Sequence, residues 1–154
     1  MNYMIWNSRG TGLKSFPSLV REIKKQYKLD FLAILETRAN ASKTERIIRQ
    51  LGFSKFTFSA AEGYSGGIWC LWEEGSLTIE VIDRQKQFMH LCIVTAKKEK
   101  WFLTVVYASP NHIYRRSLWS ALFQIKDEVQ GRWCIGGDFN ATLLANEQRS
   151  CAPS

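Results

Sequence analysis

Five residues in this sequence have side chains suited to acid–base chemistry or to holding a substrate oxygen, and each follows an apolar run. Asp138 and Asn140 lie two residues apart behind a pair of glycines, while Asn7, Glu36 and Tyr107 come at the ends of earlier apolar runs. An aspartate is a natural general base or water-orienting group. An asparagine can hold a phosphate or other substrate oxygen without adding charge. Together these residue types make Asn7, Glu36, Tyr107, Asp138 and Asn140 the candidates for a polar site.

The position of these residues relative to a sheet is what could bring them together. In open α/β sheets, ligands gather beyond the carboxyl ends of strands, so residues far apart in sequence can converge there. Glu36 and Asp138, with the amides of Asn7 and Asn140, would form an environment of hard oxygen ligands that suits Mg²⁺ or Mn²⁺ better than zinc. Two buried carboxylates without a cation would repel each other.

Each of these residues also has a purely structural interpretation. Asn7 can form an Asx turn or cap the following helix, and Glu36 can be an ordinary strand exit. Tyr107 can be a core aromatic residue whose hydroxyl group reaches solvent, and Asp138 can belong to a plain strand-to-loop turn. Taken one at a time, the residues leave both interpretations open.

Three further features lie near these positions in the sequence. Ser65-Gly66-Gly67 is most simply a turn before a strand, or a bulge. His90 stands in a strand-like run, which predicts a structural role. His112 lies in a polar loop and is the only histidine that a site could include, although a position away from any site is the favoured interpretation.

Alternating strands and helices are predicted to hold these residues in place. Apolar residues at helical spacing predict a helix over Leu13–Tyr27, a second helix capped by Ser42 and stopped by Gly52, and a third after Pro110. The predicted strands are Tyr3–Trp6, Phe31–Leu35, Phe53–Ser59, Ser65–Trp72, Leu77–Ile82, Phe88–Thr95, Trp101–Tyr107 and Arg132–Gly136. This order indicates one α/β unit with an antiparallel middle.

Two of these elements carry specific predictions about burial. The continuous apolar run Phe31–Leu35 is expected to be covered on both faces. In the third helix, one face is expected to carry the apolar residues Leu118, Trp119, Leu122, Phe123 and Val129.

Length and composition limit the class of protein. A chain of 154 residues with 45% hydrophobic content is long enough for one globular domain. No apolar run reaches the roughly 18–20 residues that span a bilayer, and the start lacks a secretory-signal pattern, so we expect an intracellular protein without a membrane partner. The cysteines are too far apart for a structural zinc site, at Cys70, Cys92, Cys134 and Cys151.

The net charge of +7 favours a polyanionic partner such as nucleic acid. The same charge also suits a solvated surface that is simply basic, so it supports nucleic-acid binding without establishing it. No obligate protein partner is evident from the sequence.

Five short motifs, taken in order, resemble the endonuclease/exonuclease/phosphatase superfamily. The motifs are Trp6–Gly10, Leu35–Thr37, Ser65–Gly67, Val106–Pro110 and Gly137–Asn140. The residues of the first and fourth motifs are similar to those in the endonuclease domain of plant LINE-type non-LTR retrotransposons. The same holds for Arg115–Trp119, which follows the fourth motif. The resemblance runs from Tyr3 to at least Asn146. It implies a deoxyribonuclease-like four-layer α/β sandwich.

The resemblance also implies roles for individual residues. Glu36 would be the principal Mg²⁺ (or Mn²⁺) ligand, with Asn7 beside it in the metal and phosphate site. Tyr107 would lie against the scissile phosphate of DNA. Asp138 would orient or deprotonate the attacking water, and Asn140 would hold a phosphate oxygen. The implied activity is Mg²⁺-dependent phosphodiester hydrolysis by an endonuclease domain of retrotransposon origin.

The last motifs of the superfamily have no match in the sequence. A metal-side Asp and the terminal Ser-Asp-His motif, which supplies the catalytic histidine, are both absent, and neither His90 nor His112 occupies the place of that histidine. The resemblance therefore implies that residues 1–154 are the N-terminal portion of a domain whose second sheet is incomplete, with Trp133–Gly137 at an unpaired edge. Very low turnover is expected for the chain by itself.

Two other functions stay open at this point. The chain can be a non-catalytic remnant that binds nucleic acid through its basic surface. It can also be a phosphatase of the same superfamily acting on a phosphoinositide or another small phosphoester. A nuclear location is implied by the resemblance alone.

Overall fold

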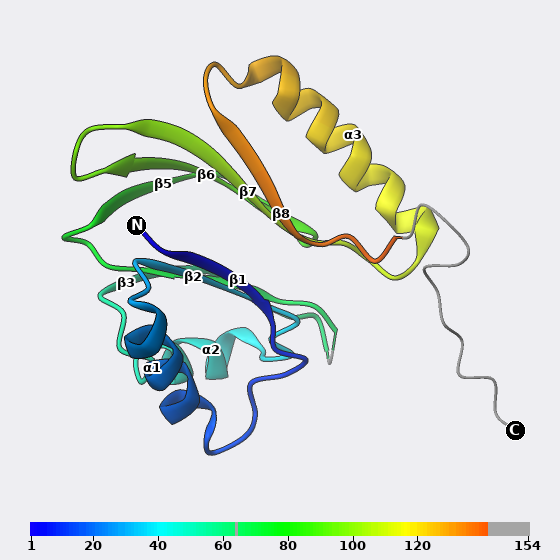
Figure 1. The fold of residues 1–154 in the computed structure, drawn as a ribbon. Helices are drawn as coiled ribbons and strands as arrows, with labels where there is room; N and C mark the ends of the chain where they lie inside the picture. The colour runs from blue at the N-terminus through cyan, green and yellow to red at the C-terminus, as the bar shows by residue number, and fades with distance from the viewer. Residues whose placement is uncertain (64, 142–154) are drawn as a thin grey trace, which may run out of the picture.

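Two four-stranded sheets lie face to face, and helices cover the outer face of each (Figure 1). The computed structural model describes residues 1–63 and 65–141. The first sheet contains, in spatial order, β1 (Tyr3–Asn7), β2 (Phe31–Leu35), β4 (Ile68–Trp72) and β3 (Lys55–Ser59). The second contains β5 (Leu77–Arg84), β6 (Phe88–Thr95), β7 (Lys100–Tyr107) and β8 (Trp133–Asp138).

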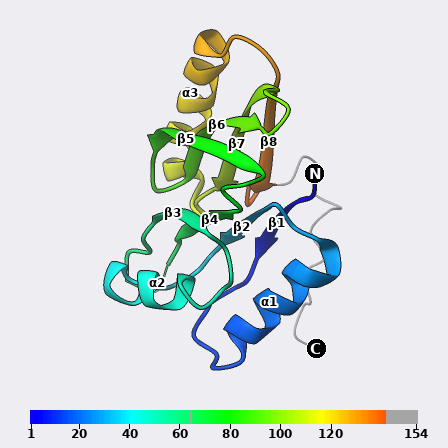
Figure 2. The same cartoon turned by 90° about the vertical axis from the view of Figure 1, so that its left-hand side faces the viewer.

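The helices complete a four-layer arrangement. α1 (Phe16–Tyr27) and α2 (Ala41–Ile48) pack on the first sheet, and α3 (His112–Glu128) packs on the second. Figure 2 shows the layers in the order helix, sheet, sheet, helix. No helix in the part of the chain that the structure describes is long and apolar enough to cross a membrane.

β2 shows why the sandwich forms. All five of its residues are buried, as the sequence predicts. Phe31, Ala33 and Leu35 face the core between the sheets, while Leu32 and Ile34 face the core beneath the helices. Since successive side chains of a strand point to opposite faces, a continuous apolar run can serve two cores at once.

Two parallel strand pairs place the predicted site residues at one end of the sandwich. β1 runs parallel to β2, with Asn7 opposite Leu35, and β7 runs parallel to β8, with Tyr107 opposite Asp138. β1 and β8 lie close across the two sheets: a Cβ added to Gly136 would be 2.8 Å from Ile5 Cδ1. The carboxyl ends of both pairs therefore meet.

Most predicted elements are confirmed, and several of their boundaries are corrected, among them the starts of α2 and β4. Strands Phe31–Leu35 and Phe88–Thr95 occur with the predicted limits. The second helix is capped by Asn40 rather than Ser42, because Asn40 Oδ1 accepts a hydrogen bond from the backbone N of Lys43 at 3.1 Å. β4 begins at Ile68, later than predicted, because the glycines before it adopt positive φ and form a loop.

The prediction of a single apolar face on α3 is wrong. Leu118 and Leu122 are buried, but Trp119 is 40% exposed and Phe123 is 67% exposed. Leu118 and Leu122 form one row along the helix, and Trp119 and Phe123 form another. The two rows are about 100° apart around the helix axis, and only one of them can face the sheet. Ile125, which was not predicted, joins the buried row.

β6 and β8 test two further predictions. His90 is buried and its Nδ1 lies 2.8 Å from Thr104 Oγ1, which confirms a structural role. Among the described residues β8 pairs only with β7, so it is an edge strand as expected.

Candidate active site

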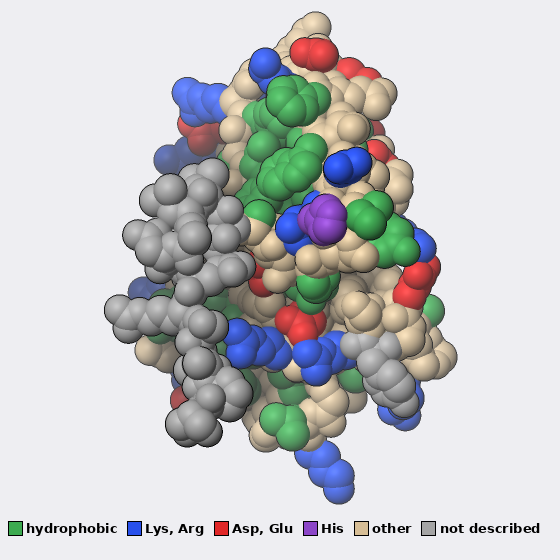
Figure 3. Space-filling view, turned by 90° about the vertical axis from the view of Figure 1, so that its right-hand side faces the viewer, with side chains coloured by type: hydrophobic (Ala, Val, Ile, Leu, Met, Phe, Trp, Pro, Cys, Tyr) green, Lys and Arg blue, Asp and Glu red, His purple; other side chains and the backbone are tan. Residues whose placement is uncertain are grey.

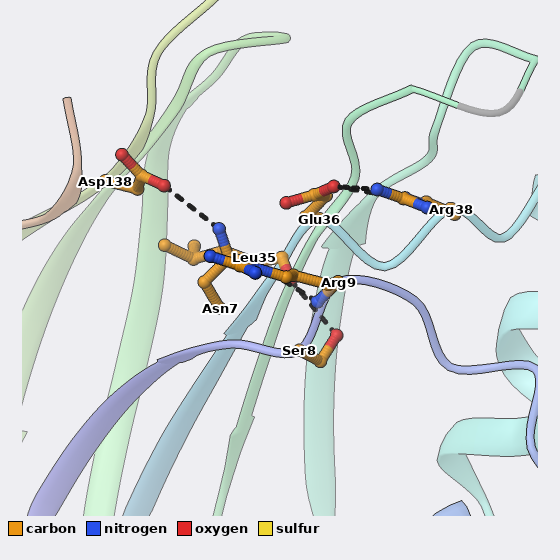
Figure 4. A network of polar contacts seen from close by, with 7 residues as sticks. All are labelled: Asn7, Ser8, Arg9, Leu35, Glu36, Arg38 and Asp138. Carbon is orange, nitrogen blue, oxygen red and sulfur yellow. Dashed lines mark hydrogen bonds and ion pairs between the residues drawn. The ribbon is translucent and has the colours of Figure 1, made fainter. Parts of the chain in front are cut away.

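A hydrogen bond between two strand ends joins the two sheets at the candidate site. Asn7 Nδ2 donates to Asp138 Oδ2 at 3.0 Å (Figure 4). Asn7 Oδ1 accepts from the backbone N of Arg9 at 3.0 Å. Because the oxygen is engaged by a backbone donor, the amide nitrogen must face Asp138. The last residues of β1 and β8 are thus held in direct contact.

Glu36 enters the site from the end of β2 with an unusual backbone. Its φ is +54°, and that of Arg38 is +53°, in the left-handed region that costs a non-glycine residue about 1–3 kcal/mol. Arg38 Nε donates to Glu36 Oε1 at 3.1 Å, and its Nη2 bonds the same oxygen. Figure 4 shows the Asn7 amide between the carboxylates of Glu36 and Asp138.

The glycine motif after Tyr64 holds the segment that follows β2. The backbone N of Arg38 donates to Gly66 O at 3.0 Å, and that of Thr37 donates to Gly67 O at 3.4 Å. A Cβ on Gly67 would lie 2.0 Å from Thr37 Oγ1. Glycine is therefore required for the loop to approach closely enough to support Glu36.

The second sheet holds Asp138 and Asn140 through backbone contacts. The backbone N of Ala108 donates to Asp138 O at 2.8 Å, and Asn140 Nδ2 donates to Ala108 O at 2.7 Å. The backbone N of Asn140 donates to Asp138 Oδ1 at 2.9 Å. Both carboxylate oxygens of Asp138 thus accept a hydrogen bond, and its rotamer is fixed.

Gly137 allows β8 to approach β7 closely enough for this arrangement. Its φ is +144°, and an added Cβ would lie 1.9 Å from Val106 O. Only glycine fits such a position.

The surroundings shift the pKa values of Glu36 and Tyr107 in opposite directions. Burial acts to raise the pKa of Glu36, but hydrogen bonds from Arg38 and Asn7 and the charges of Arg38 and Arg9 outweigh it, so the pKa lies below the ordinary value. Burial, followed by the negative charges of Glu36 and Asp138, raises the pKa of Tyr107. Glu36 is therefore ionised at neutral pH, and Tyr107 is a neutral hydrogen-bond donor.

A cleft of about 860 Å³ opens beside Tyr107. Its wall includes Gly66 and Gly67 on one side, Ser109 and Pro110 on another, and side chains of α3. Among the predicted site residues, Tyr107 thus borders a hollow large enough for part of a substrate.

The donor set fits a hard divalent cation in type. Glu36 and Asp138 supply carboxylate oxygens on either side of Asn7, and Mg²⁺ is commonly held by one or two carboxylates with water completing the shell. The described residues contain no cluster of three or more His, Cys, Asp or Glu side chains around one point. Arg38 holds the Glu36 carboxylate, so a metal there would share that group with Arg38 or displace it.

Comparisons with known proteins identify the fold. No protein-family model and no curated protein matches the sequence. The endonuclease domain of TRAS1, a telomere-specific non-LTR retrotransposon, matches with a TM-score of 0.70 at 14% identity, over 92% of this chain and 61% of that one. An AP endonuclease from Archaeoglobus fulgidus matches with a TM-score of 0.65 at 18% identity, over 96% and 60%. TDP2 from D. rerio, complexed with a single-strand DNA product, gives 0.61 at 15% identity, over 91% and 60%.

The chain has a deoxyribonuclease-like fold. These structural neighbours belong to the endonuclease/exonuclease/phosphatase superfamily, which the five sequence motifs indicate. The chain spans about three fifths of the length of the three structures described. Closeness to plant LINE elements stays a prediction.

On this deoxyribonuclease-like fold, the structure brings the five predicted site residues to one end of the sandwich. Asn7 and Asp138 are in contact, and the charge of Glu36 acts on Tyr107. Asn140 is tied to the residue that follows Tyr107. Their chemical roles stay predictions.

Two arginines beside the candidate site are missing from the sequence-based set. Arg9 and Arg38 each stand two positions after a site residue at a strand end, and both have positive φ. Of the histidines, His90 is buried within β6, and His112 begins α3 at the surface. The repeated spacing of an arginine two residues beyond a polar strand end is the signal that could have identified the pair.

Proposed function

We propose that this chain carries the metal- and phosphate-binding part of a phosphodiester hydrolase site that acts on DNA, and that it derives from a retrotransposon endonuclease. The observation that carries the proposal is the contact of Asn7 with Asp138, which joins the strand ends of two sheets beside Glu36. The deoxyribonuclease-like fold supports it, as does its likeness to the TRAS1 retrotransposon endonuclease domain and to an AP endonuclease from Leishmania major.

Each residue has a role that its surroundings favour. Glu36, ionised and next to Asn7, would hold Mg²⁺ or Mn²⁺, which when bound would neutralise phosphate charge as a Lewis acid. Asp138, fixed by two hydrogen bonds, would orient the attacking water and accept its proton. Tyr107, kept protonated, would donate a hydrogen bond to a phosphate oxygen. Asn140 would hold a second phosphate oxygen.

DNA is the favoured substrate for two reasons. The net charge is +7, which attracts a long polyanion more strongly than a small ester. One structural neighbour was solved with a single-strand DNA product. Slow turnover is expected, because neither histidine of the chain stands at the place of the superfamily's catalytic histidine, and loss of one member of a cooperating set commonly costs orders of magnitude in rate.

A second candidate, binding of nucleic acid without hydrolysis, is favoured by the Glu36–Arg38 ion pair. Arg38 neutralises the carboxylate that would otherwise recruit a metal. In that case the basic surface binds DNA and the site stays metal-free.

Metal binding separates the two candidates. Free Mn²⁺ gives a strong electron paramagnetic resonance signal that is lost when the ion binds protein. We expect Glu36→Gln to weaken Mn²⁺ binding at least tenfold, because the substitution removes the principal anionic ligand. Glu22→Gln, on the exposed face of α1, is the matched control and should bind as the wild type does. Equal Mn²⁺ affinity in the wild type and Glu36→Gln contradicts the metal site.

Nicking of supercoiled plasmid with Mg²⁺ tests the hydrolysis. We expect slow nicking that EDTA abolishes, and that Asp138→Asn reduces at least a hundredfold, whereas Asp127→Asn on α3 leaves it unchanged. Undiminished nicking by both the Glu36→Gln and the Asp138→Asn variant would contradict the proposed hydrolytic site. Release of phosphate from small monoesters in preference to nicking would move the substrate class to a phosphatase.

A further inference from the structure

The outward face of α3 carries aromatic side chains where a solvent-facing helix surface is usually polar. Trp119 is 40% exposed and Phe123 is 67% exposed, while Leu118 and Leu122 beside them are buried against the second sheet. Figure 3 shows apolar side chains gathered over this helix. The exposed pair therefore needs an explanation other than packing in the described core.

Basic side chains accompany the aromatic ones along the same side of the helix. Positions separated by three or four residues fall on one face of an α-helix. The exposed residues at this spacing include His112, Arg116, Trp119, Phe123, Lys126 and, one turn after Phe123, Asp127. The acidic residues of α3, Asp127 and Glu128, come only at its far end.

The aromatic row begins at the candidate active site. Phe139 stands between Asp138 and Asn140 in the sequence, and its ring stacks on Trp119 with centroids 5.9 Å apart and planes 2° from parallel. The same stack leaves Trp119 partly exposed. The Phe139–Trp119 stack thus connects the residue next to Asp138 with α3, where Phe123 lies one turn further along the helix.

We propose that Trp119 and Phe123 form a stacking platform for bases of a single-stranded stretch of the DNA substrate, with Arg116 contacting its phosphates. The proposal rests on the proposed function, since the platform would guide a strand toward that site. Aromatic side chains next to basic ones recognise single strands without regard to sequence, because every base has a π face. An apolar protein partner would not explain the interleaved positive charge.

Two labelled strands of equal length and charge test the platform. One is oligothymidylate and the other consists of abasic spacers, so the phosphates are the same and only the bases differ. Fluorescence anisotropy is measured with EDTA present, so the result does not depend on hydrolysis. We expect the wild type to bind the thymidylate strand about tenfold more tightly, as stacking of one or two bases provides.

Variants of the platform should remove the preference for bases. Phe123→Ala and Trp119→Ala are each expected to lower affinity for oligothymidylate by roughly fivefold or more, with little change for the abasic strand. Trp119→Phe should keep most of the preference. Tyr27→Ala is the matched control, because Tyr27 is an aromatic residue of α1 that is 50% exposed. Since Phe123 is mostly in solvent, its variant stays informative even if Trp119→Ala fails to fold.

Three results would overturn the platform. The first is equal affinity of the wild type for both strands, and the second is an unchanged preference in Phe123→Ala. The third is a self-associating chain that Phe123→Ala converts to a monomer without altering DNA binding, which assigns the face to a second copy. A chain that prefers bases but neither binds Mn²⁺ nor nicks DNA refutes the hydrolytic function alone, so the two failures are distinguishable.

Discussion

The side-chain amide of Asn7 forms an Asx turn and also contacts the candidate site. Its oxygen accepts from the backbone N of Arg9, which is the Asx turn, while its nitrogen reaches Asp138 on the other sheet. A structural role and a site role are therefore compatible. The sequence shows the residue types and their order, but the contact between the sheets could be seen only in the fold.

Glu36 makes folding stability depend on pH in a defined direction. Burial tends to raise the pKa of Glu36, yet Arg38 and Asn7 hold it below the ordinary value. A carboxyl group with a lowered folded-state pKa stabilises the protein above its unfolded pKa of about 4.3, and this contribution is lost as the pH falls through the folded value. We expect the free energy of unfolding of Glu36→Gln to fall less than that of the wild type below about pH 5.

Urea unfolding at a series of pH values measures this difference. Glu22→Gln should follow the wild type, because Glu22 is exposed on α1. Parallel curves for Glu36→Gln and the wild type would show that the lowered pKa of Glu36 is absent in solution.

Arg9 and Arg38 show what sequence reasoning could not reach at the residue scale. Both stand within motifs that resemble the superfamily, but their side-chain directions follow from φ values of +53°. L-residues adopt this conformation rarely, so neither propensity nor periodicity predicts it. Glu36 and Asp138 were predictable as candidate site residues. The spacing of the two arginines could have been noticed in the sequence, but the directions of their side chains could not be predicted from it.

At the scale of elements, periodicity predicted type well and orientation less well. Every position of the run Phe31–Leu35 is apolar, which predicts burial on both faces of the strand, and the structure confirms this. In α3 two apolar rows lie side by side, and the row containing Leu118 packs inward while that containing Trp119 does not. The helical spacing of apolar residues alone does not determine which of two neighbouring rows faces the sheet.

The start of α2 offers a direct comparison of two capping residues. Asn40 accepts from the backbone N of Lys43, whereas Ser42 lies inside the helix and donates to Asn40 Oδ1. We expect Asn40→Ala to lower the free energy of unfolding by about 1 kcal/mol, and Ser42→Ala to change it much less. Thermal or urea unfolding measures both. A larger effect for Ser42→Ala would restore the cap predicted from sequence.

Gly137 is expected to be the least replaceable position of β8. An added Cβ would collide with the Val106 carbonyl at a φ that L-residues avoid, so β8 must move away from β7. We expect Gly137→Ala to cost roughly 3 kcal/mol and to abolish Mn²⁺ binding with the nicking activity. Gly75→Ala is the control, because nothing lies within 4 Å of its added Cβ. Near-native stability of Gly137→Ala contradicts this tight β7–β8 approach.

At the scale of the whole molecule, the order of motifs carried more information than any single motif. Parallel pairing of β1 with β2 and of β7 with β8 places four strand ends together, which is why five dispersed polar residues can belong to one site. The layered fold was therefore predictable from the family resemblance. The way the two sheets lie against each other was not, because it depends on side-chain packing in the shared core.

The net charge of +7 predicts how binding of duplex DNA responds to salt. If about four phosphates are contacted, each doubling of the salt concentration should weaken binding roughly tenfold. Fluorescence anisotropy without metal measures the slope. Arg9→Gln, beside the site, should lower the slope by about one unit, whereas Arg46→Gln on α2 should not. Absence of binding at low salt would remove nucleic acid from the proposal.

The separation of the two sheets at the candidate site is set by the hydrophobic layer between them, and not by any residue of the site itself. Asn7 hangs from one sheet and Asp138 from the other, and side chains such as Ala33 fill the space between them. A larger side chain there would lengthen the Asn7–Asp138 distance while each sheet kept its own hydrogen bonds. The volume of the core therefore sets the geometry of the candidate site, and substitutions at buried positions away from it should change the Asn7–Asp138 distance.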